Sequence, residues 1–230
     1  MRSATVYSGV DGCRFGWVAV TWSDGGLDVA IARSWAEVDI DAAGIVAVDM
    51  PIGLPDSGLR ACDRAARALL PGARKSSVFS APRRYMLGKS WADANSLGKA
   101  REGVGLSKQS WQIGHKIAEL DEALSPADQD RILEAHPEVI FHRLNGWAPL
   151  ARKVGRDGRA ARIELLRAAG LPDPTPLLDR YPRKDVEADD IVDAAACALL
   201  AREIAEGRGR RVPDGDIPRD SRDLRMEIWY

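Results

Sequence analysis

The chain has 230 residues, of which 45% are hydrophobic and 29% charged, a composition typical of a folded globular protein. The chain has 33 Lys and Arg residues and 34 Asp and Glu residues, so it lacks the overall positive charge typical of a non-specific DNA-binding protein. A local cluster of basic residues is still compatible with this balance. No apolar run approaches the roughly 18 residues of a membrane span, and no signal peptide is indicated. Three widely spaced cysteines suit a reducing compartment, so we expect a cytoplasmic protein without membrane contact.

The first fifty residues predict strand, strand, strand, helix and strand in that order. Residues 5–10 and 17–22 are rich in β-branched and aromatic side chains, and 27–32 alternate between apolar and polar residues. The turn-forming residues 23–26 join the second and third strands into a hairpin. The continuous apolar run 44–48 is typical of a buried central strand.

A short helix is predicted before the fourth strand from a capping box, Ser34 with Glu37 three residues later. A helical crossover of this kind allows the fourth strand to run parallel to the first. Asp11 follows the first strand and Asp49 ends the fourth. Both carboxylates are therefore expected at one edge of the sheet, where open α/β sheets bind ligands.

The rest of the chain is predicted to be mainly helical. Helices are expected at 59–70, 107–124, 157–169 and 189–206, and the whole stretch 83–124 has helical character with glycine interruptions. A fifth strand is predicted at 132–136, followed by Pro137 at a helix start, and a short edge strand at 226–230.

The last predicted helix carries Asp190 and Asp193 near its start. Three residues correspond to about 60° around a helix, so both side chains can point the same way. The same face continues with small residues that allow close approach to the sheet: Ala194, Cys197, Ala198 and Ala201. We therefore expect the four carboxylates of Asp11, Asp49, Asp190 and Asp193 to converge on one point.

Four neighbouring carboxylates repel one another unless cations neutralise them, and oxygen-only ligands favour Mg²⁺ or Mn²⁺ over zinc. Two such ions about 4 Å apart would hold the attacking and leaving oxygens of a phosphodiester displacement. Each acid also has an ordinary structural explanation. Asp11 and Asp49 occur at turns, and the helical acids are favoured by the helix dipole.

Five stretches of the sequence resemble the DUF429 family, whose members are described as predicted ribonuclease-H-like nucleases. They are GVDGCRFGWVAV (9–20), AVDMPIGLP (47–55), RKSSVFSAPRR (74–84), EAHPEVIF (134–141) and ADDIVDAAACALLA (188–201). The last also resembles the D-x-x-D-A helix of RuvC-type resolvases, onto which Asp190 and Asp193 map, while Asp49 stands where those enzymes carry a Glu.

The resemblance implies a single ribonuclease-H-like α/β domain over residues 1–230. Its sheet is expected to be mixed and five-stranded, in the order 3-2-1-4-5, and flanked by helices. A helical insertion, 83–130, is expected between strands four and five. The implied metal ligands are the four Asp residues, with Mg²⁺ or Mn²⁺ as the cofactor.

Two further catalytic candidates, Glu134 and His136, lie at the fifth strand. Their spacing places both on one face of an extended strand, and a histidine can carry a proton near neutral pH. The alternative is a hydrogen-bonded histidine preceding Pro137, while Glu138 more simply belongs to the first turn of a helix.

A basic, hydroxyl-rich loop supplies the candidate phosphate contacts, with a solvated loop as the alternative. These candidates are Arg74, Lys75, Ser76, Ser77 and Arg83. Three further residues are candidates to line a substrate cleft: Trp91, Trp111 and His115. Buried packing beside Ile113, Ile117 and Leu120 explains Trp111 better.

The function expected from these features is metal-dependent hydrolysis of a phosphodiester in RNA or DNA, by a monomer or a homodimer. A first alternative is a small-molecule phosphotransferase or ATPase of the actin-like framework, although the GxxxxGK[ST] phosphate loop is missing. A second alternative is a ligand-binding module without catalytic activity.

Overall fold

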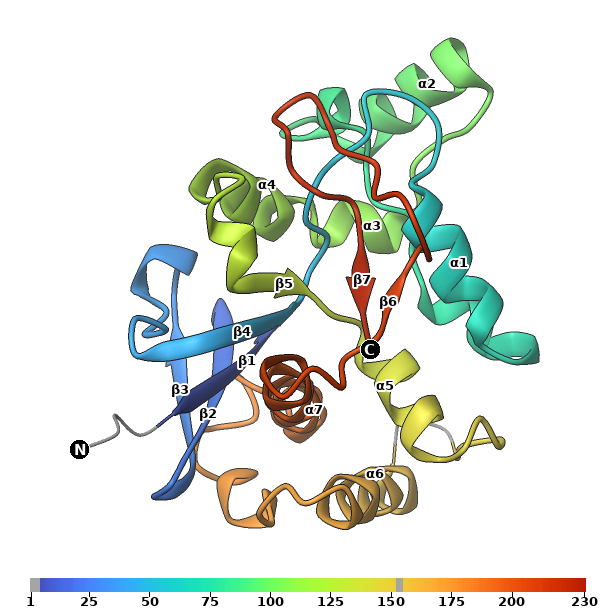
Figure 1. The fold of residues 1–230 in the computed structure, drawn as a ribbon. Coiled ribbons are helices and arrows are strands. Elements are labelled where there is room, and N and C mark those ends of the chain that lie inside the picture. Colours follow the sequence, from blue (N-terminus) through green and yellow to red (C-terminus); the bar gives the residue numbers. More distant parts are fainter. Residues whose placement is uncertain (1–4, 152–154) are drawn as a thin grey trace. The chain divides into compact units, whose positions relative to one another are not determined.

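Five strands form a mixed sheet in the order β3-β2-β1-β4-β5 in the computed structural model, which describes residues 5–151 and 155–230 (Figure 1). The strands are β1 (Val6–Gly12), β2 (Trp17–Ser23), β3 (Gly26–Ala32), β4 (Ala43–Asp49) and β5 (Ile132–Glu134). β1, β2 and β3 pair antiparallel, whereas β4 runs parallel to both β1 and β5. The predicted α/β class, strand order and parallel pairing are therefore confirmed.

Seven α-helices lie among the described residues. They are α1 (Ala61–Leu69), α2 (Trp91–Glu102), α3 (Lys108–Gln112), α4 (Gly114–Ala123), α5 (Pro137–Leu144), α6 (Arg156–Ala168) and α7 (Ala188–Ala205). Single 3₁₀ segments are η1 (Trp35–Glu37), η2 (Gly72–Ser77), η3 (Arg84–Met86), η4 (Asp128–Asp130) and η5 (Thr175–Leu177). A second sheet consists of β6 (Arg211–Val212) and β7 (Ile228–Trp229). No helix of these described ranges is both long and apolar enough to cross a bilayer.

The chain divides into two compact units. Unit 1 comprises residues 1–50, 131–210 and 229–230, and it contains the five-stranded sheet with α5, α6 and α7. Unit 2 comprises residues 51–130 and 211–228, and it contains α1 to α4. The predicted insertion, 83–130, lies wholly within unit 2, which also includes the segments 51–82 and 211–228.

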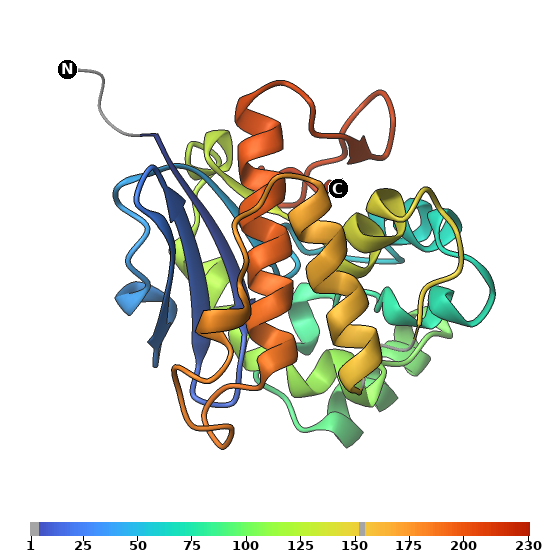
Figure 2. The ribbon, with the colours of Figure 1, turned by 90° about the horizontal axis from the view of Figure 1, so that it is seen from below.

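Within unit 1, α7 packs directly on the sheet. It contacts β1, β4 and β2 on one side and α5 and α6 on the other, as Figure 2 shows. Gly9 makes this approach possible, since a Cβ built there would lie 2.0 Å from the Ala194 carbonyl oxygen and 2.1 Å from the Ala198 nitrogen. Glycine in β1 and alanines in α7 therefore bring two backbones into contact.

Two details of the predicted elements are wrong. The segment after Ser34 is a 3₁₀ turn without a side-chain cap, and Glu37 accepts a hydrogen bond from the Arg33 N–H (3.0 Å) instead of closing a capping box. The Glu37 N–H, which the Ser34 side chain would accept in a capping box, instead donates to the Ser34 carbonyl oxygen (3.1 Å), as is typical of a 3₁₀ turn. The predicted helix 107–124 is broken at Ile113, which ends α3 and begins α4.

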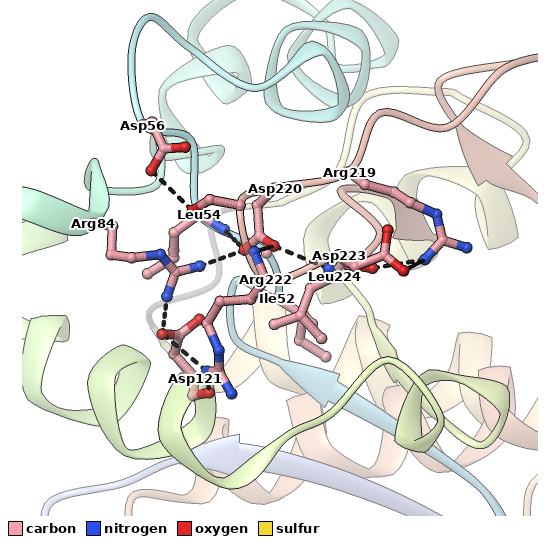
Figure 3. Close-up of polar contacts among 12 residues, drawn as sticks. Ile52, Leu54, Asp56, Arg84, Asp121, Arg219, Asp220, Arg222, Asp223 and Leu224 are labelled. Carbon is pink, nitrogen blue, oxygen red and sulfur yellow. Dashed lines mark hydrogen bonds and ion pairs between the residues drawn. The ribbon is translucent and has the colours of Figure 1, made fainter.

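A buried carboxylate, that of Asp220, joins the two chain segments of unit 2 (Figure 3). Its side chain has no exposed surface and forms an ion pair with Arg84. It also accepts hydrogen bonds of 2.9 Å from the backbone N–H groups of Leu54, Arg222 and Leu224. Two of these four donors, the Leu54 N–H and the Arg84 guanidinium, lie in 51–130, so this one side chain ties the segment 211–228 to it.

The ion network continues from Arg84 to α4. The Arg84 guanidinium also pairs with Asp121, whose carboxylate lies 3.3 Å from Arg222 (Figure 3). Arg222 in turn donates to the carbonyl oxygen of Leu124 at 2.9 Å. Two arginines and two aspartates therefore connect α4, η3 and the C-terminal segment inside unit 2.

A second polar centre in unit 2 is built on Glu102, at the end of α2. Its carboxylate accepts hydrogen bonds from the Gly58 N–H (2.7 Å), the Tyr85 hydroxyl (2.6 Å) and the Arg83 guanidinium (3.1 Å). The hydrogen bond from Tyr85 is the main cause that lowers the pKa of Glu102 below its ordinary value. Arg83 also donates to the carbonyl oxygens at 104 and 105, so it holds the turn after α2 in place.

Candidate functional site

Two carboxylates lie side by side at the carboxyl ends of β1 and β4. In the parallel pairing of these strands, Asp11 is the direct partner of Asp49. Asp11 lies two residues after Gly9, so strand alternation directs its side chain to the sheet face that α7 covers. The predicted convergence of these two strand ends therefore follows from the sheet register.

The third carboxylate comes from α7. Asp193 immediately precedes Ala194, whose carbonyl oxygen lies against Gly9. One carboxylate oxygen from each of Asp11, Asp49 and Asp193 lies within 4.8 Å of the others. Asp11 and Asp193 are buried, with 8% and 3% of their surface exposed, and Asp49 is half-buried. Three acids from three elements thus share one small, largely desolvated volume.

A family model described as "Protein of unknown function (DUF429)" matches residues 9–217, nearly the whole chain. The chain belongs to the DUF429 family. Comparisons with curated proteins and with solved structures gave no significant match. The range that matches the DUF429 model contains all three acids of the cluster.

Asp190, the fourth acid predicted for the site of this DUF429 protein, lies in the first turn of α7. Its Oδ2 accepts a hydrogen bond from the Glu187 N–H (3.0 Å), and the two residues form a reciprocal capping box. Among the described residues, the group of mutually close metal-ligand atoms consists of Asp11, Asp49 and Asp193. Helix capping is thus the role that these contacts show for Asp190, and its role as a metal ligand stays a prediction.

The predicted catalytic residues Glu134 and His136 lie at the end of β5 and just beyond it. Glu134 is buried and pairs in register with Val48, one residue before Asp49, so alternation directs it to the opposite face of the sheet. His136 is the half-buried N-cap residue of α5. The structure does not bring Glu134 into the three-acid group, and the catalytic roles of both residues stay predictions.

Glu138, which follows in α5, belongs to a buried charged cluster of unit 1. Its carboxylate pairs with Arg162 of α6 at 2.9 Å and lies 3.6 Å from the His142 Nε2. All three side chains are at least nine-tenths buried. These contacts join α5 to α6 and therefore support a structural role for Glu138.

An arginine-lined pocket opens at the start of α7 in unit 1. Its walls include Arg14, Arg159 and Arg183 together with Glu187, and its volume is about 270 Å³. Arg14 pairs with Glu187, and Arg159 pairs with Asp189. The pocket lies one to two helical turns from Asp193, since Ala188 lines it and residues rise 1.5 Å each along a helix.

The predicted phosphate-binding residues 74–77 lie within η2 of unit 2. Lys75 and Ser76 are exposed, whereas Arg74 and Ser77 are half-buried. Arg83 is almost fully buried and bonded to Glu102, which gives it a packing role in this unit. Their contact with a substrate phosphate stays a prediction.

Sequence reasoning missed Gly9 and the arginine pocket of unit 1. The small residues on one face of α7 could have indicated the role of Gly9. A helix that packs closely through alanines needs an equally small residue opposite them in the sheet. Arg14, Arg159 and Arg183 are isolated in the sequence, so no spacing pattern indicates that the fold brings them together.

Proposed function

We propose that this protein is a divalent-metal-dependent phosphodiesterase that acts on nucleic acid. The observation that carries the proposal is the group formed by Asp11, Asp49 and Asp193, with ligand oxygens within 4.8 Å of one another. Carboxylates this close together, two of them buried, destabilise each other strongly unless a cation balances them. The group is therefore best explained as a cation site.

The donor set fits Mg²⁺ or Mn²⁺. Oxygen ligands about 2.1 Å from such an ion are at most about 4.2 Å apart, so oxygens within 4.8 Å need only small movements to bind one. The set contains neither sulfur nor imidazole, which would favour zinc or copper. Asp11, Asp49 and Asp193 would hold the ion, and a bound ion of this kind supplies charge stabilisation at a phosphate and activates water.

The protein's own residues then have separate roles. The register of β1 and β4 fixes the first two carboxylates, and the close packing of α7 fixes the third. The arginines around the pocket at the start of α7 would attract and orient a polyanion near the carboxylates, since Arg binds phosphate through paired N–H groups. Nucleic acid fits this combination of a cation site and neighbouring arginines.

Substitution of the strand and helix acids is expected to abolish metal binding. We expect calorimetric titration to show saturable Mn²⁺ binding by the wild type and at least 100-fold weaker binding by Asp11→Asn and Asp193→Asn. Asp28→Asn is the matched control, because Asp28 lies in β3 of the same sheet with 73% of its side chain exposed. The metal site is disproved if the wild type binds no Mn²⁺ or if both variants bind as well as the control.

The catalytic part of the proposal is tested with labelled RNA and DNA, single- and double-stranded, in the presence of Mg²⁺ or Mn²⁺. We expect cleavage that EDTA stops and that Asp11→Asn lowers by at least 100-fold, as gel electrophoresis of the products would show. ATP hydrolysis without nucleic-acid cleavage would instead identify a phosphotransferase-like activity. Metal binding with neither reaction would identify a ligand-binding module.

A further inference from the structure

Two cavities of unit 2 share a wall, formed by Leu106 and Ser110. The first, of about 280 Å³, is lined by residues of η3, α3, the start of α4 and the loops beside them, including Lys89, Trp111 and His115. The second, of about 300 Å³, is lined by parts of α1, the loop 76–83 and the loop 104–107. Leu106 lies in a small core with Met86 and Ala94, so the shared wall has a packed support.

Exposed apolar side chains gather around these two cavities. Among the described residues, four large hydrophobic side chains are exposed: Phe79, Val104, Trp111 and Trp147. Phe79 (38% exposed) and Val104 (45%) line the second cavity, and Trp111 (41%) lines the first. Clustered apolar exposure beside cavities is typical of a binding surface, whereas isolated exposed residues are not informative.

The Trp111 side chain is held in its exposed position. Its indole Nε1 donates a hydrogen bond to the carbonyl oxygen of Lys89 at 3.0 Å. The sequence-based expectation that Trp111 packs in the core beside Ile113 and Ile117 is therefore wrong. The helix break at Ile113 separates Trp111 from the buried face of α4, where Ile117 lies.

The charged residues that line the two cavities are basic. Although Asp and Glu make up 34 of the 230 residues, none of the described residues that line either cavity is acidic. Arg67 and Lys89 supply positive charge and His115 adds a further polar group, whereas the buried Arg83 is paired with Glu102. Arg67 donates to the carbonyl oxygen of Val78 (2.7 Å), so its charge is fixed beside Phe79. The surface therefore suits an anionic ligand with flat apolar parts.

We propose that this aromatic surface of unit 2, defined by Phe79, Trp111, Arg67 and Lys89, binds single-stranded nucleic acid. Unpaired bases would stack on Phe79 and Trp111, and the backbone phosphates would contact Arg67 and Lys89. Stacking of this kind needs bases that are free of a partner strand, which favours single strands over duplex. The idea that this surface binds the substrate of a nuclease rests on the proposed function. The binding itself requires neither metal nor catalysis.

The test is fluorescence anisotropy with labelled 12-nucleotide RNA and DNA, in EDTA and at low salt. We expect saturable binding by the wild type and about 10-fold weaker binding by Trp111→Ala and by Phe79→Ala, because each removes a stacking platform. Trp147→Ala is the matched control: Trp147 is 38% exposed but belongs to unit 1, so this variant is expected to bind like the wild type. Circular dichroism verifies that each variant is folded.

The inference would be overturned if the wild type did not bind, or if Trp111→Ala and Trp147→Ala bound with equal affinity. Equal affinity of the wild type for an acidic peptide of the same length and charge would also overturn it. Tighter binding of a duplex than of either single strand would also contradict it. Because EDTA removes the metal, failure here leaves the Mn²⁺ titration of the carboxylate cluster unaffected, and failure of that titration leaves this measurement unaffected.

Discussion

Gly9→Ala is expected to destabilise unit 1 by about 3 kcal/mol, although it adds only one methyl group. The new Cβ would lie 2.0 Å from the carbonyl oxygen of Ala194 and 2.1 Å from the nitrogen of Ala198. Both atoms belong to the backbone of a buried helix, so no side-chain rotation relieves the clash, and α7 must move away from β1. Urea unfolding followed by circular dichroism measures the loss.

The same substitution is also expected to weaken Mn²⁺ binding at least 10-fold, because a shift of α7 separates Asp193 from Asp11. Gly44→Ala is the matched control in the neighbouring strand β4. Its added Cβ meets only the Val6 carbonyl oxygen, at 3.8 Å, so its stability is expected to stay within about 0.5 kcal/mol of the wild type. Equal stability of the two variants would show that contact at Gly9 does not position the helix.

The sheet could be predicted because the sequence patterns that indicate its strands and its hairpin turn each lie within a few neighbouring residues. The runs of β1 and β2 are rich in β-branched and aromatic residues, and β3 alternates between apolar and polar residues. The hairpin has its turn residues between β2 and β3, and β4 is a continuous apolar run that must be buried. Right-handed parallel crossover then leaves few strand orders to consider. The positions of Asp11 and Asp49 followed from the same argument, because each ends or nearly ends its strand.

What the sequence did not reveal depends on contacts between distant residues. Asp190 and Asp193 are equivalent in helical spacing, yet the first closes a capping box with Glu187. No local pattern distinguishes an exposed Trp111 from a buried one, since its position depends on the break at Ile113. Asp220 was not singled out at all, because its partners are up to 166 residues away.

Removing the charge of Asp220 is expected to open the C-terminal segment of unit 2. In Asp220→Asn one carboxylate oxygen becomes an NH₂ group. That group would face two donors, the N–H of Leu54 and the guanidinium of Arg84, or, if the amide flips, the N–H groups of Arg222 and Leu224 (Figure 3). A buried donor is left unsatisfied either way, and breaking one partner of a buried ion pair typically costs about 3–5 kcal/mol.

Native-state hydrogen exchange resolves this effect because it reports on each segment separately. A loss of about 3 kcal/mol corresponds to exchange on the order of 100-fold faster in peptides covering 51–60 and 216–228, whereas β1 and β4 of unit 1 are expected to keep their protection. Asp223→Asn makes the same chemical change three residues away, on a side chain that is 70% exposed, and is expected to leave exchange unchanged. Similar exchange rates in both variants would mean that the ion pair of Asp220 and Arg84 does not hold the segment 211–228 in place. Apolar packing of the buried Leu224 and its neighbours would then hold it instead.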